Sequence, residues 1–349
     1  MDYINYVKQA PFAGFAGFGG GATGLAFNSG AFEKPEGYYW GGDRGLAFGG
    51  YDAPSTVMNE IQYFGISTQT SGSDFGDITG TARYAGAAAS NGTRGLYAGG
   101  YEDPSYSNII DYVTIANTGN ATDFGDCVSS YTWGMQGVAG NPTGGASNAN
   151  RGLFAGGYNP INDVIQYVDI TSTGNAVDFG DMIYVRRQFG AVSNGSRAVW
   201  AGGYSMPQPA FVTRANMDYT TIATTGNATD FGDLLVASEG QTGCSSKTRG
   251  VFSGGSLPAS PWWGALQAIT IDTTANATSI GTQNSSAKGY SAASGNGVYG
   301  TFSGGRTTYS TKTTSMNYIT IDTHSSGYVT GFGNMGVARE GPFGYSGDA

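Results

Sequence analysis

The feature that most constrains the fold of this chain is an internal repeat of about 50 residues. The pattern R-G-x-x-x-G-G occurs at residues 44–50, 94–100, 151–157 and 249–255, with close variants at 197–203 and 299–305. Its double glycines start at positions 49, 99, 156, 202, 254 and 304, so that successive copies are 50, 57, 46, 52 and 50 residues apart. Self-similarity at such a period is typical of repeat architectures, in which each unit covers the next.

Each repeat contains four short runs with the character of β-strands. After R-G-x-x-x-G-G comes an alternating run such as residues 109–115, and then the pattern T-G-N-A-x-D-F-G-D, clearest at 118–126, 173–181 and 225–233. A run of small residues, such as 82–89, precedes the next arginine. Four strands per unit without helical periodicity describe one blade of a β-propeller.

The end of the chain predicts how the propeller closes. Residues 337–345 form a small-residue run with no R-G-x-x-x-G-G after it, and the copy at 44–50 has only a poor small-residue run before it. Pairing of this C-terminal strand with the first blade would cover two sheet edges. We therefore predict an all-β, kelch-like β-propeller of six four-stranded blades over residues 41–349, preceded by a separate segment, 1–40. Seven blades, the seventh built from 1–40 and the C-terminal strand, is the alternative.

Composition excludes several classes of function. The net charge is −9 with only 16 Lys and Arg, which argues against nucleic acid as a partner. Sixty glycines with 13% aromatic residues fit short strands and tight turns rather than disorder. The apolar runs are too short to span a membrane, and the first residues lack the features of a signal peptide.

No pattern in the sequence predicts an enzyme, a cofactor or a metal site. The single histidine, His324, falls in a turn and cannot build a zinc site or a His-dependent triad alone. Cys127 and Cys244 take repeat positions held elsewhere by small or apolar residues, which predicts that both lie in the core.

Two recurring charged positions suggest a contact between blades. The arginine that opens R-G-x-x-x-G-G and the last aspartate of D-F-G-D both disappear in the last repeat. We therefore expect ion pairs between neighbouring blades, formed by the arginines Arg44, Arg94, Arg151, Arg197 and Arg249 with the aspartates Asp77, Asp126, Asp181 and Asp233.

The loops between R-G-x-x-x-G-G and the alternating strand differ in every repeat. Because the framework repeats while these loops vary, their aromatic residues are candidates for contact with a protein or a sugar. The alternative is that the aromatic side chains only cover the end of their own blade. The candidate residues are Tyr106, Pro207, Phe211, Trp262, Trp263 and Tyr309. A longer loop near 133–149 is a second candidate surface.

The first 35 residues alternate large apolar side chains with glycines. Such a segment cannot form a core alone, but its rings would be buried in the groove of a partner. The alternative is a strand that folds onto its own propeller. The candidate anchor residues are Pro11, Phe12, Phe15, Phe18, Leu25 and Phe27.

The repeats resemble those of a known family. The glycine pairs and the period resemble kelch repeats, and the block R-G-x-F-A-G-G followed by I-D-Y-V-T-I-A-x-T-G-N-A-T-D-F-G-D is similar to virion structural proteins of marine tailed bacteriophages, cyanophages among them. Residues 44–349 carry this resemblance, although the last two repeats lose D-F-G-D. The opening residues 6–21 are similar to the N-termini of phage tail and fibre proteins.

The resemblance implies a structural rather than an enzymatic role. It implies a tail fibre, appendage or capsid decoration protein, assembled in the host cytoplasm and oligomeric in the particle. The N-terminal segment would bind other virion proteins, and the propeller would contact a host surface glycan or protein. A lectin-like propeller that binds carbohydrate outside a virion is the alternative.

Overall fold

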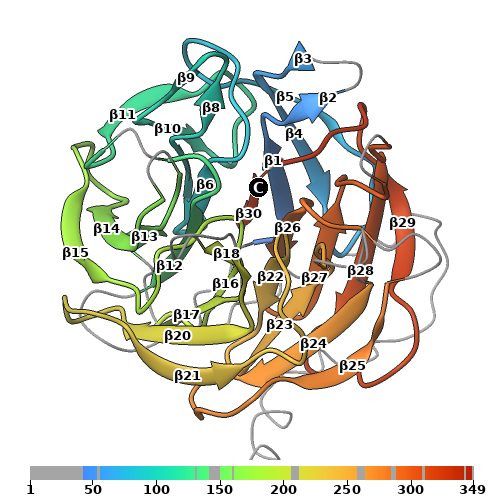
Figure 1. The fold of residues 1–349 in the computed structure, drawn as a ribbon. Helices are drawn as coiled ribbons and strands as arrows, with labels where there is room; N and C mark the ends of the chain where they lie inside the picture. The colour runs from blue at the N-terminus through green and yellow to red at the C-terminus, as the bar shows by residue number, and fades with distance from the viewer. Residues whose placement is uncertain are drawn as a thin grey trace, which may run out of the picture. The chain divides into compact units, whose positions relative to one another are not determined.

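The structure of the protein, a computed structural model, describes residues 42–52, 56–129, 132–140, 150–158, 161–205, 212–257, 264–283, 288–308, 311–341 and 343–347. These residues contain strands and turns but no helix. They form six four-stranded antiparallel sheets, which stand as blades around a central axis (Figure 1). The prediction of a six-bladed β-propeller is confirmed.

The four strands of each blade follow one another from the axis outward. Blade 1 contains β30 (Phe343–Gly347), β1 (Arg44–Phe48), β4 (Glu60–Gly65) and β5 (Ser73–Asp77). Blade 2 contains β6 (Ala87–Ser90), β7 (Arg94–Ala98), β10 (Ile109–Thr114) and β11 (Thr122–Asp126). Blade 3 contains β12 (Gln136–Gly140), β13 (Arg151–Ala155), β14 (Val164–Asp169) and β15 (Val177–Asp181).

The remaining blades have the same order. Blade 4 contains β16 (Gly190–Ser193), β17 (Arg197–Ala201), β20 (Asn216–Thr221) and β21 (Thr229–Asp233). Blade 5 contains β22 (Thr242–Ser245), β23 (Arg249–Ser253), β24 (Ala265–Thr270) and β25 (Thr278–Thr282). Blade 6 contains β26 (Ala292–Gly295), β27 (Tyr299–Ser303), β28 (Ser315–Thr320) and β29 (Thr330–Asn334).

The core lies between the blades, because a single sheet cannot cover both of its faces. The second strand of every blade is buried at its last four residues, so that its side chains pack against both neighbouring blades. Trp200 in β17 is fully buried, and its ring meets Phe189 edge to face at 6.2 Å. Cys127 and Cys244 belong to two of these inter-blade clusters, as the sequence predicted.

The ring closes through the C-terminal strand, as expected from the unpaired small-residue run. β30 pairs antiparallel with β1, from Arg44 opposite Gly347 to Phe48 opposite Phe343. The Tyr345 ring packs against Phe48, with their centroids 4.8 Å apart. Each of the six inner strands contacts the inner strand on either side, which leaves no gap for a seventh blade. The seven-bladed alternative is therefore wrong.

The pattern T-G-N-A-x-D-F-G-D joins each of the first blades to the next. The Gly174 amide of blade 3 donates to the carbonyl of Phe124 in blade 2 at 2.8 Å, and the Asp126 amide donates to the Asn175 side-chain oxygen at 3.0 Å. The two backbones are so close that a Cβ on Gly125 would lie 2.5 Å from the Gly174 oxygen, and Gly125 has a φ of +147°. We call this contact the inter-blade clasp. It explains why glycine recurs between the phenylalanine and the last aspartate.

The predicted ion pairs between these arginines and aspartates are not formed. The Arg94 Nη1 instead donates to the Ile170 carbonyl of the next blade at 2.9 Å. The other four arginines likewise donate a hydrogen bond from Nη1 to a backbone carbonyl of the next blade, and these are Arg44, Arg151, Arg197 and Arg249. The prediction was right about an inter-blade contact and wrong about the partner.

Strand length explains the error. Arg94 stands opposite Thr114, the last residue of β10, whereas Asp126 stands opposite Ile109, the first. Five residues of strand separate these positions by roughly 17 Å. The arginines lie at one end of the blades, which we call the lower face, and the last aspartates of D-F-G-D lie toward the other end, which we call the upper face.

Candidate functional site

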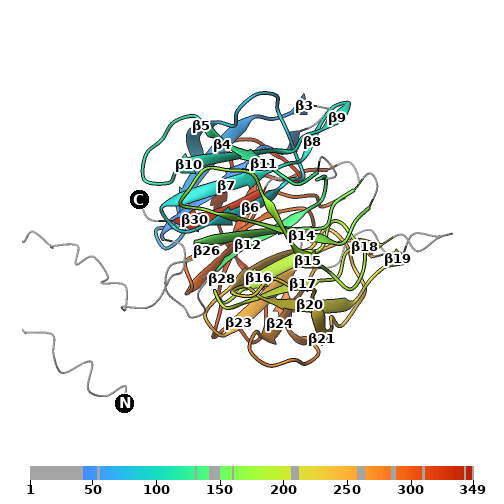
Figure 2. The same cartoon turned by 90° about the vertical axis from the view of Figure 1, so that its left-hand side faces the viewer.

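The upper face carries the loops that the sequence singled out. Three of them begin as short two-stranded ribbons, which lie on the right-hand side of the disc in Figure 2. They are β2 (Tyr51–Asp52) with β3 (Thr56–Val57), β8 (Tyr101–Glu102) with β9 (Ser105–Tyr106), and β18 (Tyr204–Ser205) with β19 (Val212–Thr213).

Only one predicted loop residue falls in the described ranges. Tyr106 lies in β9, half-buried, with its ring edge-on to Tyr101 at 5.2 Å. The other predicted loop residues lie outside the described residues, and these are Pro207, Phe211, Trp262, Trp263 and Tyr309. The six anchor residues also lie outside them: Pro11, Phe12, Phe15, Phe18, Leu25 and Phe27. Their roles remain predictions.

A closed ring of backbone hydrogen bonds surrounds the axis at the upper face. Six residues, one per blade, each donate an amide hydrogen to the carbonyl of the equivalent residue in the preceding blade, over 2.6–3.1 Å. All six have left-handed backbone, with φ between +55° and +76°. We call them the axial ring, which consists of Ala85, Gly134, Gln188, Gly240, Tyr290 and Gly341.

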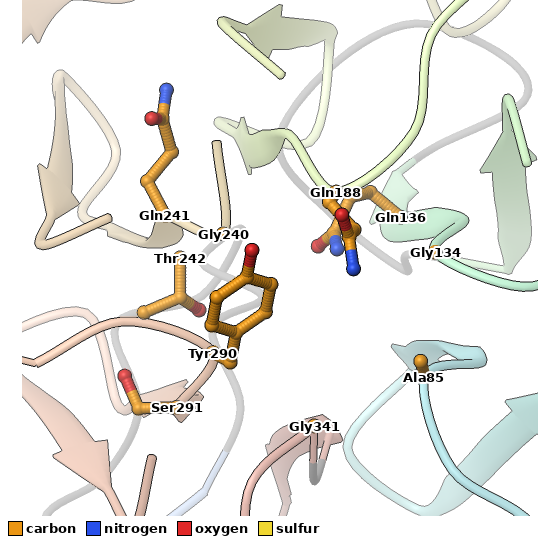
Figure 3. Close-up of a pocket in the computed structure, with 10 residues that line it drawn as sticks. All are labelled: Ala85, Gly134, Gln136, Gln188, Gly240, Gln241, Thr242, Tyr290, Ser291 and Gly341. Atoms are coloured by element: carbon orange, nitrogen blue, oxygen red, sulfur yellow. The ribbon is translucent and has the colours of Figure 1, made fainter. Parts of the chain in front are cut away.

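The space inside the axial ring is small. Figure 3 shows the Tyr290 ring between Gly240 on one side and the side chains of Gln136 and Gln188 on the other. The cavity that they line with their neighbours has a volume of about 30 Å³. This is room for about two water molecules. A larger ligand of the upper face would have to bind around the axial ring rather than inside it.

A second circle of residues surrounds the axial ring, and we call it the upper ring. Each blade contributes the residue before its axial-ring residue and the residue after its double glycine. In five blades these two residues form an antiparallel bridge, and in blade 3 their aromatic rings touch. From blade 1 to blade 6 the pairs are Glu340 and Tyr51, Tyr84 and Tyr101, Trp133 and Tyr158, Arg187 and Tyr204, Glu239 and Ser256, and Gly289 and Arg306.

Three of the four upper-ring residues in the first two blades are tyrosines. The rings of Tyr51 and Tyr84 lie 5.3 Å apart, and those of Tyr84 and Tyr101 lie 5.6 Å apart. The Lys312 ammonium lies 3.8 Å from the centre of the Tyr51 ring. These three tyrosines and Lys312 are half-buried, so part of each faces solvent. Tyrosine in such a position offers both an apolar face and a hydroxyl to a ligand.

Arg187 lies among three aromatic rings in the part of the upper ring that blades 3 and 4 contribute. Its guanidinium carbon is 4.2 Å from the ring centre of Trp133, 4.7 Å from that of Tyr158 and 5.1 Å from that of Tyr204. Nε and Nη1 of Arg187 and Nε1 of Trp133 are buried donors without a hydrogen-bond partner in the described structure. The Arg187 side chain as a whole is only half-buried, and a guanidinium is suited to a ligand that brings oxygen atoms.

Charged groups link the remaining blades. Arg306 of blade 6 forms an ion pair with Glu340 of blade 1. The Tyr290 hydroxyl donates to the Glu239 carboxylate. Burial raises the pKa of Glu239, and the positive charge of Arg187 opposes this shift.

Buried cations hold the upper ring in place from below. Arg83, Arg186 and Arg339 directly precede upper-ring residues, are fully buried and form ion pairs with strand carboxylates. Lys288 takes this position in blade 6, where its Nζ donates to the carbonyls of Phe302 and Ser315 at 3.1 and 2.9 Å. Burial lowers the pKa of Lys288 to about 7.

Sequence reasoning found the upper-face loops but missed the upper ring and the cations beneath it. The upper-ring positions could have been found from the sequence, because they stand at a fixed distance from the double glycines and from the small-residue run. Their residue types differ from blade to blade, however, so they do not form a motif. Only the bridges between them bring them together.

Among the described residues, no three His, Cys, Asp or Glu side chains are grouped so that they could hold a metal ion. His324 lies in the turn after β28 and is half-buried. Burial raises the pKa of both Cys127 and Cys244 to about 12. No helix in the described ranges has the length and apolarity needed to cross a membrane.

Two comparisons with known proteins bear on the chain. No protein-family model matches it, and no curated protein is similar enough to count as a match.

Proposed function

We propose that this protein is a non-enzymatic structural component of a phage virion, either a tail fibre or appendage protein or a capsid decoration protein. Its N-terminal segment attaches it to other virion proteins, and the upper face of the propeller is an outward recognition surface. The resemblance of the repeats to virion structural proteins supports the location, and the construction of the upper face supports the recognition role.

The observation that carries the recognition role is the contrast between a repeated framework and a varied upper ring. The axial ring has the same backbone conformation in all six blades. The residues mounted on it range from Tyr84 to Arg187 and Glu239. A rigid scaffold with different side chains at equivalent sites is how recognition surfaces are commonly built.

Detection of the protein in purified phage particles tests the proposed location. Particles should contain the full-length chain, and a chain that lacks residues 1–30 should be absent from them although it folds. If the shortened chain enters particles as well as the intact chain, the N-terminal segment is not the anchor. Absence of the intact chain from purified particles would overturn the virion role itself.

A lectin-like propeller outside a virion is the second candidate, and the aromatic residues of the upper ring favour it. Arg187 with its three rings could bind a carboxylated sugar, because the guanidinium supplies charge and donors while the rings supply apolar faces. Glycan-array binding by the full-length protein, lost in Arg187→Gln and in Trp262→Ala with Trp263→Ala, would favour this candidate. Absence of the protein from purified phage particles would favour the lectin-like propeller over the virion component.

A further inference from the structure

Blades 1 to 4 share an aromatic pair on the side that faces the next blade. The recurring arginine of each blade lies over a tyrosine of its own third strand, at 4.2–4.8 Å from the ring centre. The phenylalanine of D-F-G-D meets the same tyrosine at 5.9–6.1 Å. The four tyrosines are Tyr63, Tyr112, Tyr167 and Tyr219, so that each of these inter-blade spaces is filled by two rings.

Blade 5 has lost both rings but has kept the arginine. Ala268 stands at the tyrosine position and Ile280 at the phenylalanine position. Arg249 still binds blade 6, because its Nη1 donates to the carbonyls of Ile321 and Asp322 at 2.9 and 3.0 Å. The guanidinium is therefore fixed in the same way as in blades 1 to 4. Within the described residues, no aromatic ring covers it.

A cavity that opens to solvent lies beside Ala268, where the tyrosine ring is missing. Its volume is about 470 Å³, and Arg249, Ala268, Thr270, Asn276, Thr278 and Asp322 are among the residues that line it. Small-molecule sites in proteins generally measure about 300–1,000 Å³. The lining combines one cationic group with hydroxyl and amide side chains, which can orient a polar substituent. Blade 6 differs from blade 5, because it keeps its tyrosine, Tyr318, which packs against Tyr299 and Phe332. Tyr299 stands there in place of the recurring arginine.

We propose that this cavity between blades 5 and 6 binds a small planar aromatic molecule of about the size of phenol. Its ring lies over Arg249, as a tyrosine ring lies over the arginine in each of the first four blades. The four filled blades specify the chemistry, because they show which group the same arginine geometry accepts. A guanidinium attracts the face of an aromatic ring, and the ligand hydroxyl has Thr270, Asn276 and Asp322 nearby.

The test uses p-cresol, the side chain of tyrosine as a free molecule, with the full-length protein. We expect p-cresol to bind the wild-type chain and to raise its melting temperature, and cyclohexanol, which has a ring of similar size without π electrons, to bind about tenfold more weakly. Ala268→Tyr should place its own ring over Arg249, abolish the p-cresol effect and raise the melting temperature of the free protein. Ala265→Tyr, on the same strand but outside the cavity lining, serves as the matched control and should retain the p-cresol effect.

Three results would overturn the proposal: no binding of p-cresol to the wild-type chain, equal binding to Ala268→Tyr, or equal binding of cyclohexanol. If Ala268→Tyr does not fold, the methyl resonance of Ala268 in the wild-type protein decides the question during a p-cresol titration. A saturating shift of that resonance supports the site, and an unchanged resonance contradicts it. The outcome is independent of the virion role, since it is measured on the isolated protein.

Discussion

At the scale of single residues, the recurring arginines each serve two blades. Arg94 lies 4.3 Å from the ring centre of Tyr112 in its own blade and donates to the Ile170 carbonyl of the next. The carbonyl at the end of a strand would otherwise lack a partner, and a charged donor forms a stronger bond than a neutral one. The arginine therefore stabilises the contact between blades without any carboxylate.

Replacement of Arg94 by methionine tests this interpretation. The variant keeps the apolar stem and loses the hydrogen bond and the cation–π contact, so we expect a loss of about 1–3 kcal/mol in the free energy of unfolding. Urea denaturation measures it. Lys247→Met, in an exposed turn of the same lower face, is the control and should change stability little. Equal stability of Arg94→Met and the wild-type chain would contradict the assigned role.

Lys288 predicts a dependence of stability on pH. Its pKa falls from an ordinary 10.5 to about 7 in the folded protein, because burial disfavours the charged form. Between these two values the unfolded chain binds more protons than the folded chain, so the stability of the fold rises with pH. The slope is at most about 1.4 kcal/mol per pH unit, which gives up to about 2 kcal/mol between pH 7 and pH 8.5.

Urea denaturation at several pH values measures this dependence. Lys288→Met should lose the rise between pH 7 and pH 8.5, whatever its stability at pH 7, while Lys247→Met should keep it. A wild-type stability that stays constant or falls over this range would show that the buried lysine does not titrate there. A rise that persists in Lys288→Met would assign the effect to other groups.

At the scale of strands and motifs, the inter-blade clasp explains why T-G-N-A-x-D-F-G-D is the longest repeated pattern. Its first half binds the second half of the preceding blade, so both halves must match. Gly125 and Gly174 face one another in the clasp between blades 2 and 3, but their surroundings differ. A Cβ on Gly125 would meet the backbone of Gly174, whereas a Cβ on Gly174 would meet nothing within 4 Å.

This difference makes the two glycines a matched pair for mutation. We expect Gly125→Ala to destabilise the fold by about 2 kcal/mol or more, because the backbone is strained and the blades must separate. Gly174→Ala should be tolerated within about 0.5 kcal/mol. Thermal and urea unfolding of the two variants measure the contrast. The same loss of stability in both variants would contradict the geometry of the clasp.

The elements were predictable from sequence to the extent that they repeat. The glycine pairs, the alternating strand and D-F-G-D gave the blades, and the unpaired run at 337–345 gave the closure. The partners of Arg44 and its equivalents were not predictable, because co-occurrence in a motif does not say which ends of the strands meet. The left-handed backbone of Ala85, Gln188 and Tyr290 was not predictable from the sequence either, since these residue types rarely adopt it.

At the scale of the whole propeller, the two ends of the blades have different roles. The upper face carries the axial ring and the varied side chains around it, which form the proposed recognition surface. Toward the lower face lie the recurring arginines, and between blades 5 and 6 lies the cavity beside Ala268, where the tyrosine ring is missing. Both depend on blades held in fixed register around the axis, and therefore on closure of the ring by β30.

Amide hydrogen exchange of the C-terminal strand tests this closure most directly, because it needs no mutation. If β30 is the inner strand of blade 1, the amides of residues 343–347 should exchange as slowly as those of the inner strands β6 and β16, measured by mass spectrometry of the corresponding peptides. Exchange of 343–347 at the rate of an unfolded peptide, while β6 and β16 remain protected, would contradict the closed six-bladed ring.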